Sequence, residues 1–300
     1  MNIENYSTAA QVWALRHFGK VGPRTFRTLM VRFGNLENIF MAEMDELLDI
    51  SGLGEKRSNR IYDCDQTLDE AEEFINSMRE REIRCYTQFD DDYPYLFNEL
   101  NDPPPIFFAR GNLPKEDEKA VAIVGSHKAT SEGISYAVEL AGQLAKKSVS
   151  IVSGLARGID TSAHIGAIRA GGKSFAVLGS GFDNIYPEEN RPLAIELVEK
   201  GGLISEYAPD TKSSPGLNMA RNRLTVGLSD AVVVGEIFGD SSGTLDSAKC
   251  CFQLGKLMFV LIDGCDLPGK DNKGVEKVIE MGAIPITLDD ATEIIINSLV

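Results

Sequence analysis

Three turns rich in glycine and serine each follow a run of apolar residues in the middle of the chain. The stretches read VAIVGSHKATSEG from residue 121, IVSGLARGIDTSAH from residue 151 and FAVLGSGFDNIYP from residue 175. In an open parallel sheet, the turns that follow the strands line one edge, and ligands bind there. Because clustered backbone N–H groups bind anions, the pattern predicts a phosphate-binding surface. The turn residues expected to shape it are Gly125, Ser126, Ser153, Gly154, Gly158, Gly179, Ser180 and Gly181.

Basic side chains accompany these turns. An Arg-Asn-Arg step at 221–223 offers two guanidinium forks for bidentate contact with phosphates, around an amide that can contact a base edge. Each of these side chains alone could be an ordinary solvated residue. Their joint placement beside the predicted ends of strands favours contact with a ligand. The side chains expected at the site are His127, Lys128, Arg157, Lys173, Arg221, Asn222 and Arg223.

Familiar cofactor and catalytic motifs are incomplete in this chain. The Gly-Ser-Gly at 179–181 follows an apolar run, but Asn184 stands where the dinucleotide fingerprint needs its last glycine. The Gly-Lys-Ser at 172–174 resembles the end of a P-loop, yet Ala167 replaces the required first glycine. The three histidines form no H-E-x-x-H, and no G-x-S-x-G is present. We therefore expect no catalytic constellation, no bound cofactor and no metal.

Composition restricts the class of protein. A net charge of −15 argues against a broad electropositive surface, but it permits a small basic pocket, because salt screens charges beyond about 8–10 Å. No apolar run approaches the ~20 residues of a membrane helix, so no membrane contact is expected. The N-terminus lacks the features of a signal peptide, and five cysteines without a C-x-x-C pair indicate no disulfide framework. These features favour a cytoplasmic protein.

Apolar runs and amphipathic segments alternate after Lys119. The expected strands are AVAIVG, VSIVSG, SFAVLG, GLISE, DAVVVGE and LMFVLI, and helices are expected at about 131–147, 160–170, 188–200, 217–228 and 243–254. Fully apolar strands separated by helices are typical of a parallel sheet covered on both faces. The predicted fold class is therefore α/β, with a Rossmann-like, doubly wound and mainly parallel sheet.

The first part of the chain has a different pattern. Residues 1–82 are expected to form a small all-helical domain, because apolar residues recur at three- and four-residue spacing. The segment ISGLGEKRSNRI at 50–61 resembles a helix-hairpin-helix (SAM-like) hairpin, whose glycines admit a DNA phosphate, although a plain helix–helix turn is an equal alternative. Residues 83–300 are expected to form the extended Rossmann-like domain, with 83–119 as a proline-rich connecting segment and 266–300 as a closing tail.

Over nearly its whole length the chain resembles the DNA-processing protein A (DprA, also called Smf) family. The matching stretches are YPYLFNELNDPPPIFFARGN, VAIVGSHKAT, IVSGLARGIDTSAH, GGKSFAVLGSGFDNIYPEENRPLA, GGLISEYAP, ARNRLTVGLSDAVVVGE and SSGTLDSAK. The resemblance implies a domain that binds single-stranded DNA, forms a homodimer and helps to load RecA recombinase during natural transformation, with no known enzymatic activity. It also implies a DNA pocket that carries Arg157, Lys173, Arg221 and Arg223 and is shaped by Gly125, Ser126, Gly154 and Gly158.

Some positions depart from the family pattern. His127 stands where the family usually has arginine, and Asn-Met at 218–219 replaces the usual Phe-Pro. The leading hypothesis is a single-stranded DNA-binding recombination mediator that protects incoming DNA. An alternative is an enzyme or sensor for a small nucleotide of the related phosphoribohydrolase-like Rossmann superfamily, because Gly-Thr at 243–244 resembles their loop, although only Asp246 follows as an acid. A scaffold for protein interactions, without a nucleotide, is the third hypothesis.

Overall fold

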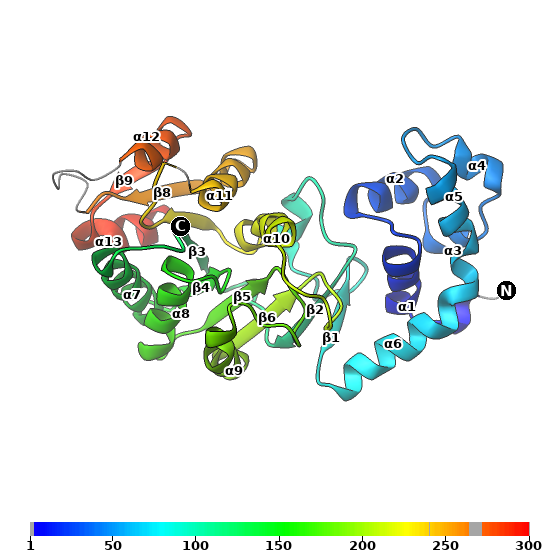
Figure 1. Cartoon of the computed structure of the whole chain (residues 1–300), viewed down its shortest axis with the longest axis horizontal. Helices are drawn as coiled ribbons and strands as arrows, with labels where there is room; N and C mark the ends of the chain where they lie inside the picture. Colours follow the sequence, from blue (N-terminus) through cyan, green and yellow to red (C-terminus); the bar gives the residue numbers. More distant parts are fainter. Residues whose placement is uncertain (1–2, 240, 264–271, 300) are drawn as a thin grey trace. The chain divides into compact units, whose positions relative to one another are not determined.

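The computed structural model describes residues 3–239, 241–263 and 272–299, which form two compact units. Unit 1 comprises Met1–Tyr93 and Asn101–Phe108, and unit 2 comprises Pro94–Leu100 and Ala109–Val300. Figure 1 shows that unit 1 is mostly helical, whereas unit 2 is built on a sheet. Residues 266–271 of the predicted closing tail lie outside the described residues.

Short amphipathic helices make up most of unit 1. Their apolar faces bury large side chains such as Leu15, Phe26, Leu29 and Ile61. The N-terminal stretch is therefore helical, as its three- and four-residue spacing predicts. Strand β1, in the segment expected to connect the two domains, was not predicted. The elements are α1 (Thr8–Trp13), α2 (Pro23–Phe33), α3 (Leu36–Phe40), α4 (Met44–Leu48), α5 (Glu55–Tyr62), α6 (Leu68–Glu80) and β1 (Arg84–Thr87).

Seven neighbouring strands, all parallel, make up most of the sheet of unit 2 among the described residues. Their order is β6-β5-β4-β3-β7-β8-β9, and each neighbouring pair is parallel. This arrangement confirms the predicted Rossmann-like, mainly parallel sheet. Strand β2 (Ile106–Gly111) precedes these strands in the chain. Their bounds are β3 (Ala120–Val124), β4 (Ser150–Ser153), β5 (Ser174–Leu178), β6 (Gly201–Ser205), β7 (Ala231–Val234), β8 (Leu257–Leu261) and β9 (Ile284–Ile286).

Helices cover both faces of this sheet (Figure 1). Helix α8 contacts α7 and α9, and α13 contacts α7, so these four helices form one layer. Helix α11 contacts α10 and α12, which form the other layer. The helices are α7 (Ser131–Lys146), α8 (Ile159–Arg169), α9 (Arg191–Lys200), α10 (Pro215–Gly227), α11 (Ser242–Gln253), α12 (Lys273–Glu280) and α13 (Leu288–Ser298).

The order of the strands creates a switch point at β3. From β3 the chain runs outward through β4, β5 and β6, and α10 then returns it to β7 on the other side of β3. The helices that follow β3 and β7 consequently lie on opposite faces of the sheet. In such folds the crevice at the carboxyl ends of the strands at this point is the usual place for a ligand.

Glu236 fixes the turn between β3 and α7. Its carboxylate accepts hydrogen bonds from the backbone N–H of Thr130 at 2.5 Å and from the Thr130 hydroxyl at 2.8 Å. The Thr130 hydroxyl in turn caps α7 by accepting from the Gly133 N–H at 3.1 Å. The Glu236 carbonyl also accepts from the N–H of Ser126 at 2.8 Å. The loop after β7 thereby sets the position of the loop after β3.

The last helix closes the hydrophobic core of unit 2. Ile295 and Leu299 of the α13 segment are buried, and Ile294 and Ile296 pack against the same core. The side of α13 that carries these residues is therefore occupied within unit 2. Among the described residues, no helix has the length and apolar character needed to cross a membrane.

His164 lies fully buried on α8, beside the start of β5. Its Nδ1 is 2.7 Å from the Ser174 hydroxyl, which itself donates to the carbonyl of Ile151 at 3.1 Å. The other ring nitrogen, Nε2, has no hydrogen-bond partner. Burial, with Arg221 nearby, lowers the pKa of His164 to about 3.

This burial predicts a loss of stability at mildly acidic pH. As pH falls below the ordinary histidine pKa of about 6.5, unfolded chains take up a proton that folded His164 does not accept until pH approaches its pKa of about 3. Stability should therefore fall between these two values, by up to ~1.4 kcal/mol per pH unit from this residue. The measurement is the midpoint of urea unfolding from pH 7 to pH 4, an interval of about three pH units across that window.

His164→Gln removes the titration and should give a flatter pH profile than wild type. Carboxylates contribute to both profiles, so the difference between them isolates the histidine. His127→Gln is the matched control, because His127 is exposed, and it should keep the wild-type slope. Parallel profiles for wild type and His164→Gln would contradict the prediction.

Candidate anion-binding pocket

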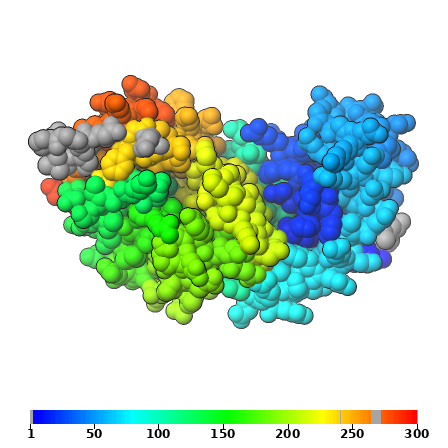
Figure 2. Space-filling view, viewed as in Figure 1, coloured from blue at the N-terminus to red at the C-terminus, as the bar shows by residue number. Residues whose placement is uncertain are grey.

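A pocket with a volume of about 340 Å³ lies at the carboxyl ends of β3, β4, β5 and β7 in unit 2. Helix α10 forms one wall, and Figure 2 shows the yellow part of the chain, which includes α10, at the visible surface of unit 2. The pocket brings together many of the residues predicted from the turns and cations. Those that line it are Gly125, Ser126, His127, Lys128, Gly154, Arg157, Gly179, Ser180, Arg221 and Asn222.

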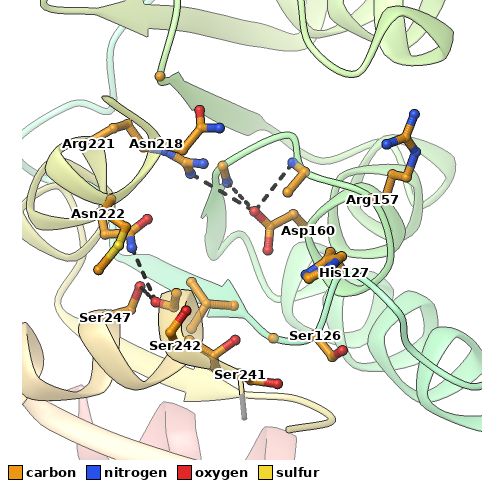
Figure 3. A pocket seen from close by; sticks show the side chains of 18 of the residues that line it. Ser126, His127, Arg157, Asp160, Asn218, Arg221, Asn222, Ser241, Ser242 and Ser247 are labelled. Atoms are coloured by element: carbon orange, nitrogen blue, oxygen red, sulfur yellow. Dashed lines mark hydrogen bonds and ion pairs between the residues drawn. The ribbon is translucent and has the colours of Figure 1, made fainter. Parts of the chain in front are cut away.

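A buried ion pair lies inside this pocket. Arg221 Nη1 is 3.9 Å from Asp160 Oδ2, and each residue is only 6% exposed. Asp160 also accepts hydrogen bonds from the backbone N–H groups of Gly154 at 3.1 Å and Ala156 at 3.4 Å. Figure 3 shows these interactions, with Arg221 and Asp160 facing one another. Strand β4, helix α8 and helix α10 thus meet at one pair of charges.

Burial perturbs both partners of the pair. It raises the pKa of Asp160 above the usual carboxyl value, although Arg221 and the two backbone N–H groups act in the opposite direction. It lowers the pKa of Arg221 below the usual guanidinium value, opposed by Asp160. Since a guanidinium remains charged in proteins, Arg221 is a desolvated cation whose charge one carboxylate only partly offsets.

Arg221 also keeps hydrogen-bonding capacity. Its Nε is buried and has no hydrogen-bond partner, and its Nη1 makes only a long 3.5 Å contact with the Thr225 hydroxyl. A buried donor without a partner is costly, and an anion in the pocket would satisfy it. This unpartnered donor is the strongest indication that the pocket binds an anion.

Gly154 is required for the position of Arg221. A Cβ atom at residue 154 would lie 1.4 Å from Arg221 Nη1, so any other residue would displace the guanidinium. Similar close approaches occur at two other turns, where a Cβ at Gly125 or Gly179 would meet Ile159 or Asn218 at 2.5 and 2.1 Å. The glycines of the three turns therefore allow backbone and side chains to crowd around the cavity.

The N-terminus of α11 forms another wall of the pocket. Ser242, Gly243 and Thr244 line the cavity, and the N-cap residue Ser241 makes no side-chain cap. Asn222 donates to the carbonyl of Gly243 at 3.2 Å (Figure 3) and to the carboxylate of Asp246 at 3.1 Å, and both bonds link α10 to α11. The positive end of a helix dipole thus faces the same cavity as Arg221.

Arg157 and the turn after β3 lie where the pocket meets solvent. Arg157 is exposed and binds both carboxylate oxygens of Glu189, through Nε at 2.5 Å and Nη2 at 2.9 Å. Hydrogen bonds, to Glu189 first and then to Tyr186, raise the pKa of Arg157. His127 and Lys128 are exposed, and the N–H of Lys128 donates to the Ser126 hydroxyl at 3.1 Å. These side chains can reach a ligand from the rim.

Two predicted cations lie elsewhere and have carboxylate partners. Lys173 directly precedes β5, which places it at the end of that strand opposite to the pocket, where it pairs with Glu118. Arg223 lies on α10 outside the pocket lining, and its Nη2 donates to the buried Glu206 at 2.5 Å. The predicted set of four basic residues is therefore not brought to one place: Arg157 and Arg221 line the pocket, whereas Lys173 and Arg223 do not.

Three predicted turn residues support the pocket without lining it. Ser153 is buried, and its hydroxyl donates to the Ile123 carbonyl at 2.6 Å. Gly158 has φ of +72°, and a Cβ there would lie 2.2 Å from the Ser126 carbonyl oxygen. Gly181 packs against the backbone of Ala208, which a Cβ would meet at 2.0 Å. These residues shape the turns behind the cavity.

Several residues that line the pocket were not predicted from the sequence. Asp160 is one of them, although its place just after the second turn is a signal that could have identified it. Tyr186, Asn218 and Met219 also line the pocket, as does the start of α11 at 241–244. The turn after β7 could have been found by the rule that selected the first three turns, because it too follows an apolar strand.

The described residues include no group of three or more His, Cys, Asp and Glu side chains that could hold a metal ion. The pocket itself presents hydrogen-bond donors and the buried Arg221 cation around a small cavity. Such an arrangement can bind and orient an anionic group.

Residues 84–297 match the family model for DNA recombination-mediator protein A. Protein Smf of Synechocystis sp. (strain ATCC 27184 / PCC 6803 / Kazusa) is 34% identical over 267 residues, which cover 88% of this chain and 66% of that protein. The chain thus spans about two thirds of the length of this curated relative.

Two solved structures have a similar fold. The structure of DNA processing protein A (DprA) from Streptococcus pneumoniae has a TM-score of 0.77 at 28% identity and covers 95% of this chain and 97% of its own. That of DNA processing protein A from Helicobacter pylori, described by its single-stranded DNA binding mode, has a TM-score of 0.62 at 28% identity. It covers 72% of this chain and 97% of its own. The resemblance stated from the sequence is confirmed.

The clash at Gly154 gives a direct test of the anion site. In Gly154→Ala, the new methyl group would occupy the place of Arg221 Nη1 and push the guanidinium aside. We expect inorganic phosphate to bind about 10- to 100-fold more weakly, the loss of one charged hydrogen-bond donor. Isothermal titration calorimetry measures this change.

Gly216→Ala is the matched control, because a Cβ at Gly216 would meet nothing within 4 Å and the residue does not line the pocket. This variant should bind phosphate as wild type does. Wild-type affinity in Gly154→Ala would mean that the anion does not contact Arg221.

Proposed function

The chain belongs to the DNA recombination-mediator protein A family, and from this premise we propose that it binds single-stranded DNA at the pocket and passes it to a RecA recombinase. The single observation that carries the proposal is the buried Arg221 guanidinium, whose Nε has no hydrogen-bond partner at the edge of a glycine-lined cavity. A phosphate of the DNA backbone can accept a hydrogen bond from this donor, and DNA is the ligand expected for a recombination mediator.

The size and position of the pocket favour a single strand over a duplex. The cavity has a volume of about 340 Å³ and lies between four strand-end turns and the start of α11. An unpaired strand can turn its backbone and bases separately, so one phosphate can enter while a base takes another place. In a duplex the phosphates are fixed on a rigid rod, and the buried Arg221 is out of their reach.

We assign different roles to the lining residues. Arg221 binds a phosphate at the centre, and the start of α11 at 242–244 adds backbone N–H donors. His127, Lys128 and Arg157 reach the strand from the exposed rim. The protein carries a net charge of −15, so this small pocket supplies the attraction and few phosphates are neutralised.

In this proposal the protein binds DNA and catalyses no reaction. Asp160, the buried carboxylate in the pocket, already accepts two backbone N–H groups and faces Arg221. That environment suits a group that positions the cation. The competing function, an enzyme or sensor for a small nucleotide, uses the same cavity, since Gly243 and Thr244 line it. Titration with free nucleotides discriminates the two.

The remaining parts of the proposal concern partners and the helical unit. RecA loading, a role in natural transformation and a homodimer are supported by the family resemblance. The hairpin before α5 adds a candidate DNA contact, because Gly52 and Gly54 have φ of +80° and +71° and no side chain caps α5. The homodimer needs a surface other than the buried side of α13, which packs in the core.

Arg221→Gln tests the central contact. We expect its affinity for an oligo-dT strand to fall about tenfold or more, because a charged hydrogen bond in a desolvated site is lost. The slope of log affinity against log salt should decrease by about 0.7, the value for one phosphate contact to a single strand. Fluorescence anisotropy at several salt concentrations measures both quantities, and wild type should bind the strand more tightly than a duplex.

Lys173→Gln also removes one positive charge, but at the amino end of β5, away from the pocket. It should keep wild-type affinity and slope, because Lys173 pairs with Glu118 outside the pocket. If the two substitutions weakened binding equally, the pocket would not be the DNA site. Free nucleotides that bound more tightly than the strand would favour the competing function.

A further inference from the structure

Tyr186 places an exposed aromatic ring on the wall of the pocket. The residue follows the turn after β5, lines the cavity and is 55% exposed. Met219 of α10 lines the same cavity and is 43% exposed. Apart from these two, the large apolar side chains of the lining, such as Leu178, are buried or partly covered. A ring left open beside a phosphate-binding cavity is not explained by packing.

The Arg157 side chain contacts the Tyr186 ring. Its guanidinium carbon lies 5.7 Å from the centroid of the Tyr186 ring, within the range of a cation–π interaction. The guanidinium also makes two hydrogen bonds to Glu189, at 2.5 and 2.9 Å, although both residues are about half exposed. These contacts favour one orientation of the ring before a ligand binds, which lowers the entropy lost on binding.

We propose that Tyr186, supported by Arg157, is a stacking position for one unpaired nucleobase whose neighbouring phosphate binds at Arg221. This inference rests on the proposed function. It assigns a binding position to the base, which the anion site at Arg221 does not contact. Every base has an aromatic face, so stacking on tyrosine accepts any sequence. A base paired inside a duplex offers no free face, and the ring therefore adds selectivity for single strands.

The dimensions agree with a single nucleotide. Tyr186 and Arg221 line one cavity of about 340 Å³, which is at the lower end of small-ligand sites. The phosphate donors lie deep and buried, whereas the ring is exposed. A strand can accordingly insert one phosphate and lay the adjoining base against the ring while the rest of the chain stays in solvent.

The test compares an oligo-dT strand with an abasic strand of equal length and charge. Wild type should bind oligo-dT more tightly, and Tyr186→Ala should weaken oligo-dT binding about 5- to 100-fold, the usual contribution of one stacked base. Binding of the abasic strand should not change. Tyr186→Phe should keep wild-type affinity, because stacking needs the ring and not the hydroxyl. A strand with 2-aminopurine should be quenched by wild type and Tyr186→Phe, and less by Tyr186→Ala.

Phe252→Ala is the matched control, since Phe252 is an exposed aromatic residue of unit 2 outside the pocket. It should bind both strands as wild type does. Equal weakening of both strands by Tyr186→Ala, or no effect on either, would overturn the stacking role. Arg221→Gln separates the two proposals, because it should weaken both strands. If wild type bound neither strand, the DNA site and the stacking position would both be wrong.

Discussion

The pocket depends on one buried ion pair, between Arg221 and Asp160. Burying two charges costs free energy that their attraction repays only with good geometry and further hydrogen bonds. Asp160 has those bonds, from the N–H groups of Gly154 and Ala156. Arg221 does not, because its Nε is left without a partner. The hydrogen bonds of Asp160 are therefore satisfied and those of Arg221 are not, and this asymmetry is the basis of the anion site proposed above.

Other ion pairs of unit 2 differ in how easily a phosphate could compete for them. Arg157 and Glu189 are both about half exposed, so their pairing contributes little and can be exchanged. Arg223 is paired with Glu206, which is buried, and taking Arg223 away would leave a carboxylate without compensation. An acidic protein can thus have a few cations at one place that are available to bind a phosphate. Arg223, by contrast, is held by a carboxylate whose own burial requires a cation beside it.

The sequence predicts the sheet better than it predicts the site. Apolar strands alternate with helices along the chain, so the parallel sheet, its turns and the place of Gly125 and Gly154 follow from local pattern. The Arg221–Asp160 contact joins residues 61 positions apart on α10 and α8 (221 − 160 = 61). The periodicity of the sequence does not predict such a long-range contact. Lys173 shows a different limit. It lies next to a glycine pair, but it precedes its strand, and the direction of a parallel strand decides which edge a residue occupies.

Asp160 also limits how tightly the pocket can hold its ligand. A phosphate that approaches Arg221 comes near the Asp160 carboxylate as well, so repulsion opposes part of the attraction to the guanidinium. Burial raises the pKa of Asp160, whereas Arg221 and the backbone N–H groups of Gly154 and Ala156 oppose that shift. The affinity of the deep site is consequently set by a balance within the pair and not by the cation alone. Such a balance agrees with the proposed transfer of a strand to a recombinase, because a free buried guanidinium would bind phosphate more tightly and release it more slowly.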